Sequence, residues 1–188
     1  MVNILNPYVH EYDFPYHDTL KQYKNEILNQ YFIEKKTHPN LTDLNLPINH
    51  PLISLLIPSL NKIVNDNFIV EKPLMNFGLR IYVQNQNLST SFYHMHKTAS
   101  SLSGVFYLDP PKEGGEIAFL IEPDANILSS KSYQEELIIK PKKDKVYFFP
   151  YWLFHKPLPQ KDKEYRMCFN FLYGSSIRPI HKLSLTPW

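Results

Sequence analysis

The sequence predicts a mainly β protein, a sandwich or jelly-roll barrel with helices packed against its outside. Two features of the composition favour strands: the 188 residues include 13 Tyr and 12 Phe, and Pro (16) outnumbers Gly (5). The third observation is that strand-like segments follow one another between turn residues from about residue 70 onward. A chain of this length buries roughly 70% of its unfolded surface, so a single domain can fold without a metal or disulfide staple.

The first third of the chain has a helical pattern instead. Apolar residues recur at helical spacing over residues 20–31, and Asp18 or Thr19 can serve as the N-cap. A second helix is predicted over residues 51–64, where the proline at position 58 predicts a kink or a break.

The remaining chain alternates between predicted strands and turns. The strands are expected over residues 77–84, 88–96, 102–109, 116–122, 135–140, 145–150 and 164–173. We expect one domain, in which residues 1–70 form a helical buttress, residues 71–176 the β core and residues 177–188 a C-terminal tail.

Charge and cysteine content exclude several classes of protein. The formal net charge of +2 argues against a long nucleic-acid footprint. The single cysteine, Cys168, excludes an intrachain disulfide framework and suits a reducing compartment. The first residues lack the pattern of a signal peptide, and no apolar run reaches the ~18–20 residues of a membrane span. We therefore expect a cytoplasmic protein (in the host cytoplasm if the source is viral) with no membrane partner.

A pair of histidines, His94 and His96, lies inside the predicted strand 88–96. Side chains alternate along a strand, so the two imidazoles point to one face, about 7 Å apart. A third histidine, His155, follows the predicted strand 145–150. Two histidines from one strand and a distant third are typical of a facial metal site on a jelly roll, with positions left open for substrate and dioxygen. The alternative is a chance grouping in a chain with eight histidines, the other five having surface or capping roles.

Arginine is rare, and Arg166 lies in the aromatic segment 164–173. Alternation places Arg166, Cys168 and Asn170 on one face of this strand and three large apolar residues on the other, which we interpret as the core. An inward guanidinium needs an anionic partner. That partner is either the carboxylate of a ligand, bound in bidentate fashion, or an internal Asp or Glu in a structural ion pair.

Three stretches extend this pattern. They are Phe92-Tyr-His-Met-His96 with Ser-Leu-Ser-Gly-Val-Phe-Tyr-Leu at 101–108, then Gly-Gly-Glu-Ile-Ala-Phe at 114–119, then Phe149-Pro-Tyr-Trp-Leu-Phe-His155 with Arg166. Together, over about residues 75–173, they resemble the Fe(II)- and 2-oxoglutarate-dependent oxygenases, and more closely a bacterial and phage branch with a His-x-His pair. The resemblance implies a double-stranded β-helix, a cupin-like jelly roll.

The resemblance also implies roles for individual residues. His94, His96 and His155 match the metal ligands, with His96 where most of the superfamily has Asp or Glu. Arg166 matches the residue that binds the far carboxylate of 2-oxoglutarate, and Tyr107 a tyrosine that often helps it. Asn170 and Gln84 are further candidates for lining the cosubstrate pocket, although Gln84 can equally be a polar residue on the sheet face.

The histidine at position 96 changes the charge of the implied site. With Fe(II), two histidines and a carboxylate carry +1, whereas three neutral imidazoles carry +2, which the 2-oxoglutarate dianion neutralises. Three imidazoles also suit zinc, nickel or copper. Two alternatives therefore remain, a three-histidine dioxygenase that does not use 2-oxoglutarate and a non-catalytic metal-binding cupin module.

The leading prediction is a hydroxylase that uses Fe(II), 2-oxoglutarate and O2, with ascorbate as a possible support, and releases succinate and CO2. The prime substrate is not encoded in any recognisable motif, and a small molecule or a protein side chain is favoured over a nucleic acid.

Overall fold

The computed structural model describes most of the chain. The described residues are 2–6, 8–14, 17–39, 41, 44, 46–47, 49–70, 75–78, 81–82, 92–96, 100–121, 135–161, 166–174 and 177–179. Residues 123–134 between two predicted strands, the cosubstrate candidate Gln84 and most of the predicted tail lie outside them.

In the described part of the chain, three helices lie between residues 13 and 68: α1 (His17–Lys21), α2 (Lys24–Thr37) and α3 (Pro51–Asn67). The predicted N-cap at 18 or 19 is wrong for the main helix, because α1 ends at Lys21 and α2 is preceded by Tyr23, which makes no side-chain cap. The second helix begins at residue 51 as predicted, since the His50 ring Nδ1 accepts a hydrogen bond from the Leu52 amide at 3.1 Å. It continues through Pro58 without a break. Within the described part of the chain, no helix has the length and hydropathy needed to cross a membrane.

Seven strands form the larger sheet, in the order β1-β2-β9-β6-β11-β4, with β5 also paired to β11. Their bounds are β1 Val2–Asn6, β2 Val9–Asp13, β4 Met75–Gly78, β5 Ile81–Tyr82, β6 Ser100–Asp109, β9 Lys145–Pro150 and β11 Arg166–Gly174. All of the pairings are antiparallel.

The smaller sheet has the order β10-β7-β8, built from His155–Pro157, Ile117–Ile121 and Glu135–Ile139. A separate pair joins β3 (Phe68–Val70) to β12 (Ile177–Pro179), so that the end of α3 is tied to the C-terminal region. The chain enters β7 through a turn in which Gly114 and Gly115 have φ angles of +71° and +69°. Because L side chains rarely adopt such angles, this turn needs glycine.

The arrangement confirms the predicted mainly β fold with N-terminal helices and differs from the prediction in several elements. The strands predicted at 102–109, 116–122, 135–140 and 145–150 are present nearly as expected. The helical pattern of residues 1–70 did not predict β1 and β2, which extend the larger sheet by pairing with β9. The predicted strand 88–96 is not a strand over residues 92–96, where one isolated bridge joins His94 to His155.

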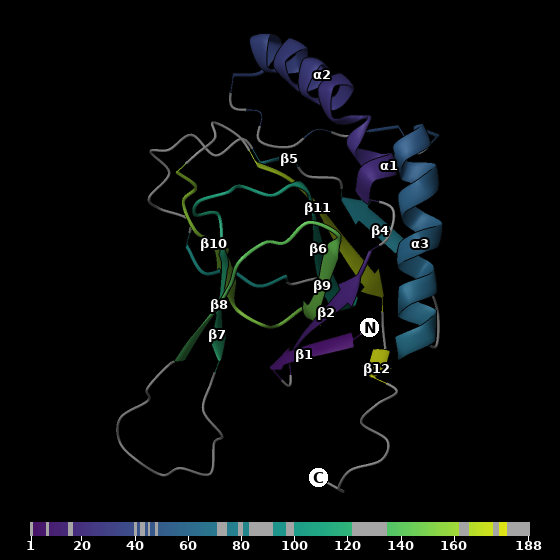
Figure 1. The fold of residues 1–188 in the computed structure, drawn as a ribbon, viewed down its shortest axis with the longest axis vertical. Coiled ribbons are helices and arrows are strands. Elements are labelled where there is room, and N and C mark those ends of the chain that lie inside the picture. The colour runs from purple at the N-terminus through teal and green to yellow at the C-terminus, as the bar shows by residue number, and fades with distance from the viewer. Residues whose placement is uncertain are drawn as a thin grey trace, which may run out of the picture.

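The elements stack in layers, with the helices against one face of the larger sheet and the smaller sheet against the other (Figure 1). Apolar residues of the helices pack against one face of the larger sheet, to which the sheet contributes Phe106, Phe169 and Phe171. The opposite face of the same strands, including Val105 and Tyr107, packs against the smaller sheet. Alternation along β6 and β11 thus supplies both cores, and the space between the two sheets is where the candidate site lies.

Candidate metal centre

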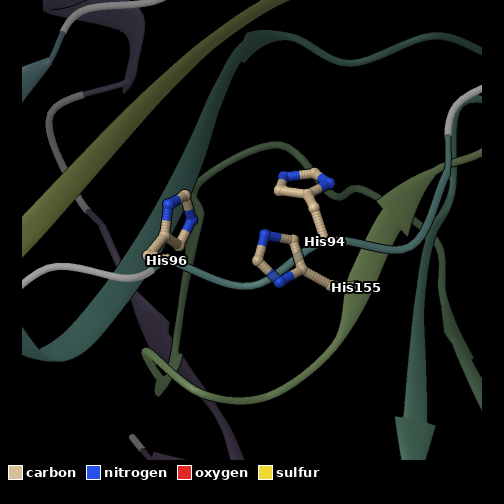
Figure 2. Close-up of side chains that lie close together, drawn as sticks. All are labelled: His94, His96 and His155. Atoms are coloured by element: carbon tan, nitrogen blue, oxygen red, sulfur yellow. The ribbon is translucent and has the colours of Figure 1, made fainter.

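Three histidines from two segments converge between the two sheets. His94 and His96 lie on the segment before β6, and His155 is the first residue of β10 (Figure 2). One ring nitrogen from each lies within 4.8 Å of the others, and the ring centroids are 4.5 Å (94–155), 5.1 Å (96–155) and 5.8 Å (94–96) apart. The structure therefore brings together the three residues that the sequence singled out.

Backbone hydrogen bonds fix the relative position of the histidines. The amides of His94 and His155 each donate to the carbonyl of the other at 3.0 Å, and the His96 amide donates to the Tyr151 carbonyl at 3.0 Å. The His155 Nδ1 lies 2.8 Å from the Leu153 carbonyl, which fixes the proton on Nδ1 and leaves Nε2 with its lone pair. The His94 Nδ1 has a similar but longer contact, 3.3 Å, with the Phe92 carbonyl.

The three imidazoles differ in exposure. His155 is 5% exposed, with Phe149 and Phe119 packed beside its ring at centroid distances of 4.8 and 6.0 Å. Burial lowers the pKa of His155 to about 3, so its ring is neutral and able to ligate near neutral pH. His94 is exposed and His96 half-buried, so the cluster opens toward solvent on their side.

The histidines line one part of a cavity of about 400 Å³ that includes its open mouth. Tyr107 and Asn170, both predicted to line the cosubstrate pocket, lie in its wall together with Cys168. Register explains this, because Cys168 pairs with Tyr107 and Asn170 pairs with Val105 across β11 and β6. Arg166 is the first residue of β11, two positions from Cys168, and its backbone alone is described, paired with Tyr82 of β5.

Several cavity residues were not predicted from the sequence. The apolar part of the wall and its one glycine come from four different strands: Gly104, Val105, Ile117, Phe149 and Pro157. Ile117 lies in the 114–119 stretch and Phe149 in the 149–155 stretch. Both motifs therefore contained cavity residues that the sequence analysis did not assign to the cavity wall. The orienting role of the Leu153 carbonyl depends on backbone geometry, which has no signature in the sequence.

The donor set fits a bound divalent first-row metal. Among the described residues, this histidine trio is the one grouping of His, Cys, Asp or Glu side chains close enough to hold an ion together. Neutral imidazole nitrogens suit Fe(II), zinc, nickel and copper alike. Three nitrogens on one side of an ion leave its other side open to the cavity, as a catalytic site requires.

Comparison with known proteins identifies the class. Residues 81–171 match the model of the family described as "Putative 2OG-Fe(II) oxygenase". No curated protein matches the chain by sequence. The predicted resemblance to the Fe(II)- and 2-oxoglutarate-dependent oxygenases is therefore confirmed over the β core.

Solved structures agree on the fold. A collagen prolyl hydroxylase from Paramecium bursaria Chlorella virus-1, solved with 2-oxoglutarate, is 16% identical, with a TM-score of 0.59 over 93% of this chain and 100% of that one. A Pseudomonas putida prolyl-4-hydroxylase is 13% identical (TM-score 0.59, 89% and 88% covered). The carbocyclase SnoK from nogalamycin biosynthesis is 14% identical (TM-score 0.62, 95% and 87% covered).

The chain thus folds as a double-stranded β-helix. Within it, residues 81–171 match the family model of the 2-oxoglutarate- and Fe(II)-dependent oxygenases. The family match and the histidine trio support Fe(II) as cofactor and 2-oxoglutarate and dioxygen as cosubstrates.

Proposed function

We propose that this oxygenase is a hydroxylase that converts substrate, 2-oxoglutarate and O2 into hydroxylated substrate, succinate and CO2. The observation that carries the proposal is the convergence of His94, His96 and His155 on a cavity that Tyr107 and Asn170 also line. Bound Fe(II) supplies the activation of dioxygen and the oxidation of a C–H bond.

In this proposal, His94, His96 and His155 hold the iron. The neutral, oriented His155 imidazole provides a fixed ligand, and the more exposed His94 and His96 complete the set. His96 takes the place that a carboxylate occupies in most of the superfamily. The iron site then carries +2 before the cosubstrate binds, which favours a dianionic ligand.

Arg166 and Tyr107 bind the distal carboxylate of 2-oxoglutarate. Support comes from the strand register, since the histidine end and the Tyr107 end of the cavity lie at opposite ends of β6. Leu102 pairs with Pro150, whose neighbour Tyr151 binds His96, while Tyr107 pairs with Cys168 beside Arg166. A guanidinium suits bidentate binding of a carboxylate. Asn170 lines the cavity between these ends, and Gln84 is kept as a candidate for the same pocket.

The prime substrate is a protein side chain or a small molecule. Two of the structural neighbours are described as prolyl hydroxylases and one as a carbocyclase from nogalamycin biosynthesis, so proline-containing peptides are the first compounds to test. The near-balanced charge of the chain disfavours a long nucleic-acid footprint.

The test is succinate production from 2-oxoglutarate with Fe(II) and ascorbate, first without and then with a panel of proline peptides. His155→Ala is compared with His38→Ala, which removes an exposed histidine at the end of α2, far from the cavity in the chain. We expect turnover in the wild type and in His38→Ala, and loss of turnover in His155→Ala.

Arg166→Ala separates the candidate functions. If it raises the KM for 2-oxoglutarate at least tenfold (about 1.4 kcal/mol) while Fe(II) binding is unchanged, the assigned role is supported. Oxygen uptake without 2-oxoglutarate, unchanged in Arg166→Ala, would point to a three-histidine dioxygenase that acts directly on its substrate. Binding of zinc without oxygen uptake under either condition would point to a non-catalytic module.

A further inference from the structure

Three side chains, Glu136 and Lys156 on the smaller sheet and Tyr93 on the segment beside it, form a contact cluster that the proposed reaction does not use. The Tyr93 hydroxyl donates a hydrogen bond to the Glu136 carboxylate. The Lys156 ammonium lies 4.1 Å from the centroid of the Tyr93 ring and 3.5 Å from the same Glu136 oxygen, Oε1. Each member therefore contacts the other two.

The cluster lies directly behind the candidate metal ligands. Tyr93 precedes His94 and Lys156 follows His155 in the chain. Because the bridge between His94 and His155 is antiparallel, Tyr93 lies opposite Lys156. Alternation sends the histidines into the cavity and sends Tyr93 and Lys156 to the outer face.

Glu136 extends the cluster across the whole smaller sheet. It lies on β8, which is separated from β10 by β7, and the segment of Tyr93 lies on the far side of β10. Adjacent strands are about 4.8 Å apart, so the contacts from Tyr93 to Glu136 span roughly 14 Å of sheet. The cluster thus joins the segment 92–96 to all three strands.

Backbone pairing alone holds the segment 92–96 weakly. Among the described residues, the backbone hydrogen bonds of this segment to other elements are the two of the His94–His155 bridge and the one from His96 to Tyr151. A slip of one residue in an antiparallel pairing turns every side chain to the other face of the sheet. Such a slip would turn His94 and His96 out of the cavity.

We propose that Tyr93, Glu136 and Lys156 are positioning residues, which set the register of segment 92–96 against β10 and so hold His94 and His96 in place before a metal arrives. The proposal rests on the proposed metal site for its function. The cluster itself contacts neither metal nor cosubstrate, and its effect passes through the histidines.

The first readout is the affinity of the metal-free protein for Co(II), with the intensity of the Co(II) ligand-field bands as a report on coordination geometry. Tyr93→Leu and Lys156→Met should each weaken Co(II) binding about three- to tenfold, the range expected for one cation–π contact or ion pair. Tyr93→Phe, which keeps the ring, and Lys156→Arg, which keeps the cation, should retain most of the affinity. Lys62→Met is the matched control, since it breaks an exposed ion pair with Asp66 on α3.

The second readout needs no metal. Amide hydrogens of His94 and His96 should exchange at least about threefold faster in Tyr93→Leu and Lys156→Met than in Lys62→Met, because the bonds to His155 and Tyr151 open more often. The proposal is overturned if Tyr93→Leu and Lys156→Met show the same amide exchange rates and the same Co(II) affinity as the wild type. It is overturned as well by an equal loss in Lys156→Arg and Lys156→Met. If the wild type binds no Co(II), the proposed metal function fails, and the exchange rates still decide whether the cluster sets the register.

Discussion

Gly104 is the position where the fold leaves least room for a side chain, and its replacement gives a quantitative prediction. A Cβ built at Gly104 would lie 2.0 Å from Cε2 and 2.3 Å from Cζ of Phe171, the residue that pairs with it across β6 and β11. Ordinary carbon contacts begin near 3.4 Å, so the phenyl ring would have to move by more than about 1 Å.

The ring has no free space in which to move. Phe171 is 1% exposed and packs against Phe148 at a centroid distance of 5.2 Å. Overpacking of this kind costs about 1–3 kcal/mol, partly offset by the ~0.4–1 kcal/mol that Gly→Ala gains from the unfolded chain. The middle of these ranges is a net loss of about 1.3 kcal/mol. For a chain of this size, each 1 kcal/mol of lost stability lowers Tm by about 2–4 °C, so we expect Gly104→Ala to lower Tm by about 3–5 °C.

Urea denaturation and thermal unfolding of Gly104→Ala, Phe171→Leu and the double variant measure this effect. Because a smaller side chain at position 171 makes room for the new methyl group, the double variant should be more stable than the sum of the single effects predicts, by about 1 kcal/mol. Additive effects, or a Gly104→Ala variant as stable as the wild type, would refute the packing argument.

Two further substitutions test ion pairs. Asp109→Asn removes the carboxylate that lies 2.5 Å from Lys24, a side chain that is 21% exposed, and should cost about 1–2 kcal/mol in urea denaturation. Adding Lys24→Met to Asp109→Asn should restore part of the lost stability. If the stability losses of the two single variants simply add in the double variant, the two side chains are not a coupled ion pair. Asp13 accepts a hydrogen bond from Lys145, which lowers the pKa of its carboxyl from 3.8 to about 2. The stabilisation is present above pH 3.8 and is lost as pH falls through about 2, so the Tm difference between wild type and Asp13→Asn should shrink toward zero over that interval. A difference that persists at the acid end would contradict this origin.

Patterns within a short stretch of sequence correctly predicted a strand's two faces and the start of a helix. Alternation in 164–173 correctly separated Phe169 and Phe171, which lie in the helix-side core, from Cys168 and Asn170, which line the cavity. Pro51 correctly marked the start of α3. These predictions succeeded because burial of one face of a strand or helix requires apolar residues at the repeat of that element.

Elements fixed by tertiary pairing were not predictable. The strands β1 and β2 form because β9 offers an open edge, and nothing near residues 2–13 encodes that partner. His10 was expected at the surface, yet it is 8% exposed in β2 and packs against Tyr12 and Phe68. Segment 92–96 has strand composition, but among the described residues it makes one isolated bridge in place of a continuous ladder.

The candidate site was predicted by residue type and order. The histidine trio followed from spacing and resemblance, and the structure brings its nitrogens together. The hydrogen bond that orients His155 and the cluster behind the ligands depend on contacts between strands far apart in the chain, which one sequence does not reveal.

The most direct test of the central claim is an anaerobic titration of the metal-free protein with Fe(II) and then with 2-oxoglutarate, followed by visible absorption. The wild type and His38→Ala should develop a weak charge-transfer band when 2-oxoglutarate chelates the iron, and His155→Ala should not. Wild-type protein that binds Fe(II) but shows no band, or a band of full intensity in His155→Ala, would contradict a cosubstrate-binding iron centre at these three histidines.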